Sequence, residues 1–319
     1  MKIKNLTSDG QSKRKLLAYI GIFTVVLVWG INPIITLELY RYYSPAFRLV
    51  AVNIILIPTY LILSAKHIRE FNADYWKIGI PTGLFLALAD VLQKVGLQYT
   101  TPAKYAFLEN LSCITVPAFM FLFVRKKPTF VTWISCLTCL ASAFALNATS
   151  LIGGAQTWGI GEILCGVAGL LYGVNIAATG AFAKKLYAPL YLAVQSAVSL
   201  VVALIFSLVL NFVTVPGALG DPEPMEKLVF SFKPLHLLFL VVAALISSAF
   251  CWIVRTNSMK YIEASKVAVI MPFSAVITSV ISVLMGTDSL TVSLVVGGFL
   301  GLVAIILSGF DGTVKKKGE

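Results

Sequence analysis

The sequence predicts an all-α membrane protein with ten transmembrane helices, arranged as two inverted five-helix repeats with both termini cytoplasmic. Three observations predict this fold: the composition, the number of long apolar segments and an internal repeat. Hydrophobic residues make up 58% of the 319 residues and charged residues 12%, whereas soluble domains carry about 25% charged residues. A water-soluble core cannot bury so much apolar surface, so the lipid bilayer is the first expected partner.

Ten apolar segments are long enough to cross the hydrocarbon core, which takes about 20 helical residues. Their hydropathy is continuous and not alternating, which favours helices over the strands of a membrane barrel. The expected spans are 16–36, 46–64, 78–97, 105–124, 129–147, 158–181, 187–213, 234–256, 266–285 and 290–309. We expect one integrated transmembrane domain, divided into a basic N-terminus (1–15), a first repeat (16–150), a second repeat (151–310) and a basic tail (311–319).

The internal repeat is visible as matched residues in the two halves. Residues from Trp29 onward align with residues from Tyr172 onward. The matched pairs are Gly30 with Gly173, Asn32 with Asn175, Thr36 with Thr179, Pro45 with Pro189, Tyr99 with Tyr261, Lys104 with Lys266 and Ser112 with Ser274. Because each copy holds five spans, the second copy must enter the bilayer upside down. Inverted repeats are typical of carriers that open alternately to the two sides of a central site.

The basic residues predict the orientation in a plasma (inner) membrane. With the N-terminus in the cytoplasm, most of the 25 Lys and Arg residues fall inside, including Arg255 and Lys266. The exceptions are Arg41, Arg48, Lys94, Lys104, Lys227 and Lys233. This excess fits the positive-inside rule. It also explains the net charge of +11 without nucleic acid as a partner.

Neither a cofactor nor an enzyme motif is evident. The five cysteines all lie in apolar stretches, and the Cys136-x-x-Cys139 pair lacks a second pair or nearby histidines, so packing is favoured over metal binding. The two histidines fall at segment ends. No GxxxxGK[ST], HExxH or GxSxG motif occurs, which disfavours ATP use, metalloprotease and hydrolase chemistry.

Charged residues inside the spans are costly and therefore need an explanation. Asp90 and Lys94 stand one turn apart in the third span, beside Gln93. Their spacing allows either a self-paired structural ion pair or a polar cavity wall. Arg48 and Glu162 lie just inside their spans, where an interfacial position or, for Glu162, a favourable charge at a helix N-terminus is expected.

Glu109 and Asn110, in the fourth span, have no basic partner on the same helix face. A lone carboxyl group at that depth tends to stay protonated, because burial disfavours the charged form. Glu109, together with Asp90, is therefore a proton-coupling candidate, although a cavity-edge carboxylate facing water is the alternative. The repeat mate of Asn110 is Pro272, which removes a backbone donor and weakens the ninth span.

Two matched segments, Trp29-Gly30-Ile31-Asn32 and Tyr172-Gly173-Val174-Asn175, place an aromatic residue, a glycine and an amide at the same depth. Both amides would point at one central volume if the repeat axis passes between the helices; interhelical hydrogen bonding is the alternative. The full set of candidate substrate-binding residues is Trp29, Asn32, Asp90, Lys94, Tyr99, Glu109, Asn110, Tyr172, Asn175 and Gln195.

Several short motifs occur in a fixed order along residues 16–310. Trp29-Gly30-x-Asn32 is followed by Pro45-Ala46-Phe47-Arg48, and the later motifs are 96–104, Pro117, Gly161-Glu162 and 261–265. Together they resemble the drug/metabolite transporter superfamily in its ten-helix EamA-type branch. Val124-Arg125-Lys126 departs from the Leu-Gly-Glu that often follows span four. The resemblance implies a carrier of small metabolites, often an exporter, with a central cavity between its halves.

We therefore expect a secondary active transporter of a small polar metabolite, such as an amino acid or amine, working by alternating access with proton coupling or exchange. Asn32 and Asn175 would hydrogen-bond the solute, while Trp29, Tyr99 and Tyr172 would form apolar walls. A passive channel or facilitator is the main alternative, and a membrane-embedded enzyme is less favoured. A monomer or homodimer is expected.

Overall fold

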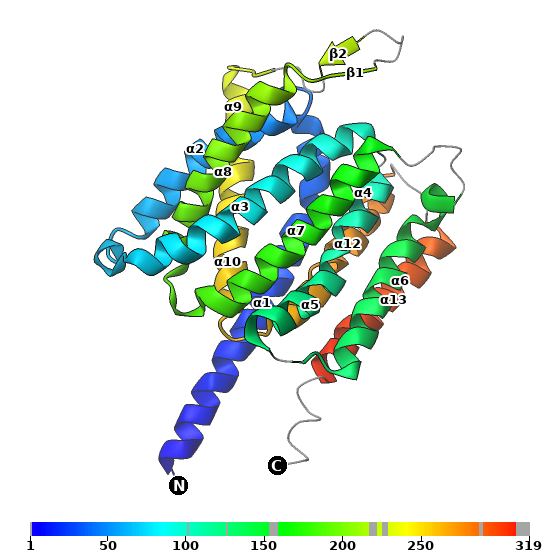
Figure 1. Cartoon of the computed structure of the whole chain (residues 1–319). Helices are drawn as coiled ribbons and strands as arrows, with labels where there is room; N and C mark the ends of the chain where they lie inside the picture. The colour runs from blue at the N-terminus through cyan, green and yellow to red at the C-terminus, as the bar shows by residue number, and fades with distance from the viewer. Residues whose placement is uncertain are drawn as a thin grey trace.

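The computed structural model describes residues 2–100, 102–125, 127–152, 159–216, 222–224, 229–286 and 290–310. These residues are almost entirely helical (Figure 1). The exception is a short antiparallel pair of strands, β1 (Thr214–Pro216) and β2 (Pro222–Pro224), between the seventh and eighth spans.

The first half contains α1 (Lys2–Leu39), α2 (Pro45–Leu63), α3 (Ala73–Gly96), α4 (Pro102–Glu109), α5 (Ser112–Val124) and α6 (Phe130–Ile152). The second half contains α7 (Ile160–Phe182), α8 (Ala188–Leu210), α9 (Pro234–Ala243), the π-helix η4 (Ala244–Phe250), α10 (Cys251–Ser258), α11 (Ala264–Ile270), α12 (Phe273–Leu284) and α13 (Val292–Phe310). Single 3₁₀ turns cover Ile68–Glu70 (η1), Leu97–Tyr99 (η2) and Ala183–Lys185 (η3).

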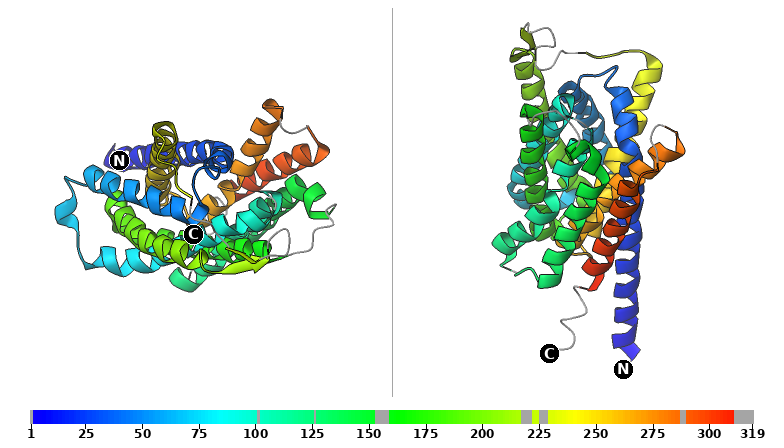
Figure 2. Two further views of the ribbon diagram at one scale, coloured as in Figure 1. Left: turned by 90° about the horizontal axis from the view of Figure 1, so that it is seen from above. Right: turned by 90° about the vertical axis from the view of Figure 1, so that its right-hand side faces the viewer.

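The expected spans are present as helices. In the described part of the chain, nine helical segments are long and apolar enough to cross a membrane, and Phe47–Leu63 is a shorter apolar helix at the place of the second span. The protein is therefore a multi-pass membrane protein. The start of α1 and the end of α13 lie at the same end of the bundle (Figure 1), and α1 extends beyond the other helices there (Figure 2).

The fourth and ninth spans are each interrupted once, at positions that the repeat matches to within one residue. Asn110 and Leu111 form a turn between α4 and α5, and Met271 and Pro272 form one between α11 and α12. The weakening expected at Pro272 is confirmed, because proline has no N–H to continue the ladder. The fourth span, expected as one continuous helix, breaks at the matched position.

The interrupted span of each half packs on the first helix of the other half: α5 packs on α7, and α12 packs on α1. The aligned glycines occupy equivalent contacts in these two pairs. A Cβ on Gly173 would lie 2.4 Å from Thr115 Cβ, and a Cβ on Gly30 would lie 2.6 Å from Ile277 Cγ2. Glycine at both positions therefore lets the neighbouring helix approach closely.

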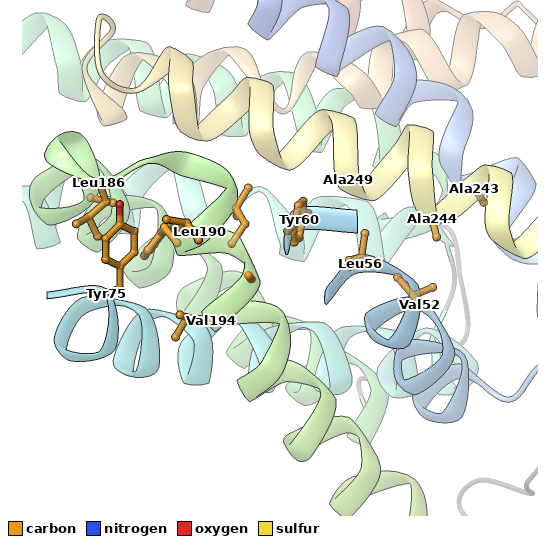
Figure 3. Packing of buried hydrophobic residues seen from close by; sticks show 14 of the residues in the cluster. Val52, Leu56, Tyr60, Tyr75, Leu186, Leu190, Val194, Ala243, Ala244 and Ala249 are labelled. Atoms are coloured by element: carbon orange, nitrogen blue, oxygen red, sulfur yellow. The ribbon is translucent and has the colours of Figure 1, made fainter. Parts of the chain in front are cut away.

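A buried apolar cluster joins the two halves on the α2 side. It contains Tyr60 of α2, Tyr75 of α3 and Leu190 of α8, with Ala244 of η4 on the far side (Figure 3). Tyr60 and Leu190 are each 1% exposed. This cluster packs α2, α3, α8 and η4 against one another.

Both histidines stack on tyrosines in interhelical loops. His67 lies 4.1 Å from Tyr187 and His236 lies 3.6 Å from Tyr42, measured between ring centroids. The first stack joins the loops that flank η1 and η3, and the second joins the α1–α2 loop to the start of α9. Both histidines therefore lie at the ends of spans, as the sequence predicted.

Two neighbouring glycines in α7, Gly166 and Gly169, allow a test of how tightly α4 and α7 pack. A Cβ on Gly169 would lie 2.2 Å from the carbonyl oxygen of Leu108, whereas the nearest atom to a Cβ on Gly166 is 3.8 Å away. Gly169→Ala is expected to lower the free energy of unfolding by about 1–3 kcal/mol, the usual cost of overpacking. Gly166→Ala should leave thermal unfolding of the purified protein unchanged or slightly improved. Equal melting temperatures for the two variants would contradict this packing.

Candidate functional site

The first polar group, here the carboxylate cluster, lies where α3 meets α4 and α7. It consists of Asp90, Gln93, Lys94, Tyr105, Glu109 and Tyr172. The Tyr172 hydroxyl contacts both Asp90 Oδ1 and Gln93 Oε1, the latter at 2.8 Å. Lys94 Nζ donates to Gln93 Oε1 and to the Tyr105 hydroxyl, both at 3.2 Å.

Asp90 and Lys94 do not form a direct ion pair. Their carboxylate and ammonium groups interact electrostatically at longer range. The Asp90 carboxyl group hydrogen-bonds Tyr172 of α7, and the Lys94 ammonium group donates to Tyr105 of α4. Glu109 faces the same cluster, next to Gln93 and within electrostatic range of Lys94 and Asp90. Gln93 is 2% exposed. The ion pair between Asp90 and Lys94 that their spacing allowed is therefore not formed, and both residues belong instead to a cluster with residues from both halves.

The second polar group, here the arginine cluster, is centred on Arg255 of α10. Its guanidinium donates to Asn175 Oδ1 at 3.1 Å and lies 4.2 Å from the centre of the Trp252 ring. Trp252 packs edge-on against Trp29, at 5.5 Å between ring centroids. Arg255 is 2% exposed, so the cation is fully removed from bulk water.

This position of Arg255 corrects the sequence interpretation, which counted Arg255 and Lys266 among the basic residues on the cytoplasmic side. Arg255 is buried within the span Pro234–Ser258, and Lys266 is 8% exposed in α11. The π-helix η4 directly precedes α10, the helix that carries Arg255. Trp29 Nε1 donates to the carbonyl oxygen of Ser247 in that π-helix at 2.8 Å.

Asn175 connects the arginine cluster to α3. Its Nδ2 donates to the carbonyl oxygen of Thr82 at 2.8 Å, and its Oδ1 accepts from Arg255. Gln195 Nε2 donates to the Tyr191 hydroxyl, which lies 2.8 Å from Thr82 Oγ1. Asn175 therefore serves interhelical hydrogen bonds, the alternative that the sequence left open for it, whereas Gln195 bonds within α8 to Tyr191, which in turn contacts Thr82 of α3.

The two clusters occupy equivalent places in the two halves. The interval between Tyr99 and Tyr261, applied to Asp90 and Gln93, leads to Trp252 and Arg255. Tyr172 of α7 contacts Asp90, and its repeat mate Trp29 of α1 contacts Trp252. Extending the repeat alignment back from Tyr99 by six residues, less than two helical turns, would thus have identified Arg255 from the sequence.

Other predicted residues lie elsewhere. Asn32 is half-buried, and its Oδ1 has no hydrogen-bond partner in the described part of the chain. Tyr99 packs with an apolar cluster of α2, α3 and α8, and Asn110 sits buried in the turn after α4. Among the described residues, Asn32 and Asn175 form no hydrogen bond with each other.

Arg48 of α2 is buried near the two clusters. It is 8% exposed, its Nη2 donates to Thr36 Oγ1 at 3.5 Å, and it interacts electrostatically with Asp90. The structure also contains a half-open apolar cavity of about 330 Å³ between α3, α5 and α7. This cavity reaches Thr82, but none of Asp90, Lys94, Glu109 and Arg255 lines it.

The cysteines take part in helix packing. Cys113 and Cys136 each place a sulfur near the other's carbonyl oxygen, at 3.6 and 3.0 Å, and all five cysteines are free and buried. In the described residues, no group of three or more His, Cys, Asp or Glu side chains could hold a metal ion.

This architecture, a helical membrane bundle with two matched halves and charged residues buried where the halves meet, defines a class of membrane transport proteins. The family model described as "EamA-like transporter family" matches residues 16–148 and 159–310. The chain therefore belongs to the EamA-like transporter family, as two repeats of its unit.

Structural similarity supports the same fold. A solved structure described as "Crystal structure of protein" is similar to this chain with a TM-score of 0.71 and 15% sequence identity, covering 97% of this chain and 99% of that one. At this identity the similarity concerns the fold alone. No curated protein matches the sequence.

Proposed function

We propose that this protein is a secondary active transporter that moves a small polar metabolite by alternating access between two inverted halves. The supporting observation is that the carboxylate cluster and the arginine cluster occupy repeat-matched places and are joined through α7. A carrier needs one site that both halves share, since rocking of one half against the other then exposes it to each side in turn.

The hydrogen-bond pattern around Tyr172 supports proton coupling through Asp90. The Tyr172 hydroxyl contacts two acceptors, Asp90 Oδ1 and Gln93 Oε1, although a phenol carries a single proton. Lys94 donates to Gln93 Oε1, which identifies that atom as the amide oxygen. A protonated Asp90 that donates to Tyr172, while Tyr172 donates to Gln93, satisfies all three groups. Glu109 is the second proton-coupling candidate.

Counterflow in proteoliposomes tests the carrier function. Vesicles are loaded with an unlabelled solute, and uptake of the labelled solute from outside should overshoot its equilibrium value. A carrier gives this overshoot because binding sites exchange one solute for another, whereas a channel does not. Uptake of labelled solute without counterflow, for every solute tested, would favour the passive channel or facilitator instead.

The proposed location is the plasma membrane, with both termini cytoplasmic and with export as one expected direction. The basic residues near the start of α1 support this orientation. A cysteine introduced near residue 11 should react with an impermeant thiol reagent only after the cells are opened. Labelling in intact cells would reverse the proposed orientation.

A further inference from the structure

We propose that the solute carries a carboxylate and binds it through Arg255, with Arg48 as the second cation. This inference rests on the proposed transport function and names the substrate class of that site. Three observations carry it: unused donors on both arginines, the balance of buried charge, and the aromatic surroundings of Arg255.

The unused donors come first. Arg255 uses Nη2 to bind Asn175, and Arg48 uses Nη2 to bind Thr36. The Nε atoms of both arginines are buried and have no hydrogen-bond partner in the described part of the chain. A buried donor on a charged group is costly to leave unsatisfied, by about 1–3 kcal/mol or more. The Nε–H group of each arginine is therefore available to a hydrogen-bond acceptor that the described residues do not provide.

Gln93 lies in the same surroundings: its Oε1 accepts from Lys94, and its amide group faces Glu109. The buried atoms without a hydrogen-bond partner on the two arginines, Arg48 Nε and Arg255 Nε, are both donors, whereas Asn32 Oδ1 is an acceptor in the described part of the chain. A carboxylate complements the two arginine donors, and Asn32 Oδ1 is left for a donor elsewhere on the solute.

The charge balance favours a single negative charge. Asp90 interacts electrostatically with Lys94, Arg255 and Arg48, and Glu109 with Lys94. When Asp90 has released its proton and Glu109 is ionised, three cations face these two acids, and one monovalent anion neutralises the site. A phosphate ester carries about −1.5 to −2 charges, so a carboxylate fits this balance better.

Trp252 and Asn175 hold the Arg255 guanidinium in a fixed plane. The ring centre of Trp252 lies 4.2 Å from the guanidinium carbon, and Asn175 fixes one terminal nitrogen. A planar, oriented guanidinium binds carboxylates through two parallel hydrogen bonds, whereas lysine acts as a point charge. The Arg255 geometry therefore suits a carboxylate more than a diffuse anion.

The test compares four solutes of equal length that differ at their ends: 4-hydroxybutyrate, 4-aminobutyrate, 1,4-butanediol and putrescine. Thermal unfolding of the purified full chain is measured with each at millimolar concentration. We expect 4-hydroxybutyrate to raise the melting temperature most and putrescine to have no effect. A larger rise with putrescine or butanediol than with the carboxylates, or no rise with either carboxylate, would overturn the inference.

Variants then assign the effect to Arg255. Arg255→Gln and Arg255→Lys should each weaken carboxylate binding by roughly 10- to 100-fold, the loss expected for a charge-assisted hydrogen bond. Arg41→Gln is the matched control, because Arg41 pairs with Glu38 on the exposed surface. Should Arg255→Gln fail to fold, Arg48→Gln provides the second variant, with a smaller loss. Unchanged carboxylate affinity in the folded variants would refute the assignment.

Counterflow of the same four solutes separates this inference from the transport function. Counterflow of putrescine or butanediol without counterflow of the carboxylates keeps the carrier and removes the proposed solute class. Uptake without counterflow, for every solute tested, removes the carrier function itself.

Discussion

Glu162→Gln is expected to destabilise the protein by about 3–5 kcal/mol, because it breaks a buried ion pair from one side. The Glu162 carboxylate accepts from Lys104 Nζ at 2.9 Å, Thr100 Oγ1 at 2.8 Å and the backbone N–H of Gly159 at 2.7 Å. Glu162 and Lys104 are 5% and 3% exposed. The variant leaves the Lys104 ammonium buried beside a neutral amide, and a fall in melting temperature measures the cost.

The matched control is Glu38→Gln. Glu38 pairs with Arg41 at 3.2 Å, but both side chains are more than half exposed, and such surface pairs contribute about 0–1 kcal/mol. The double variant Lys104→Met/Glu162→Gln should regain much of the lost stability, since neither buried charge is then present. If Glu162→Gln unfolds at the same temperature as Glu38→Gln, the pair does not stabilise the junction of α4 and α7.

The same pair shows what the sequence could and could not predict. A favourable charge at the N-terminus of its helix was predicted for Glu162, and the hydrogen bond to Gly159 in the first turn of α7 confirms it. Its partner Lys104 stands 58 residues earlier. No local pattern relates the two residues, because the contact depends on how α4 packs against α7.

The arginine cluster illustrates a second limit. Hydropathy placed the end of the eighth span at residue 256, and Arg255 was counted with the basic residues of the cytoplasmic side. The structure instead buries Arg255 beside Trp252 and Asn175, and the preceding π-helix η4 is tied to α1 through the Trp29–Ser247 hydrogen bond. Hydropathy alone does not show which side chains near the end of a span point inward, whereas the repeat match between Arg255 and Gln93 carries that information.

The carboxylate cluster was more predictable because its signal is local and duplicated. Asp90 and Lys94 are one turn apart in a hydrophobic helix, and Tyr172 was singled out by its match to Trp29. The structure brings Tyr172 to Asp90 and Gln93. Repeat symmetry thus predicted which helices contribute polar side chains, although it did not predict which atoms pair.

Asp90→Asn is expected to abolish solute accumulation driven by a pH gradient while preserving counterflow. Asparagine resembles the protonated carboxyl group that completes the hydrogen bonds of Tyr172 and Gln93, but it cannot release a proton. With one proton per solute, a pH difference of about one unit drives roughly tenfold accumulation. Accumulation in the variant should therefore fall to the equilibrium value, with counterflow near the wild-type rate.

Asp74→Asn provides the control, since Asp74 lies exposed at the start of the same helix. The charged groups around Asp90 are Lys94 on α3, Glu109 on α4, Arg255 on α10 and Arg48 on α2. Glu109 could replace Asp90 as the coupling group, because it faces the same lysine. Loss of pH-driven accumulation in Glu109→Gln, with accumulation retained in Asp90→Asn, would transfer the role to Glu109. Retention in both variants would exclude coupling through this cluster and leave solute exchange as the transport mode.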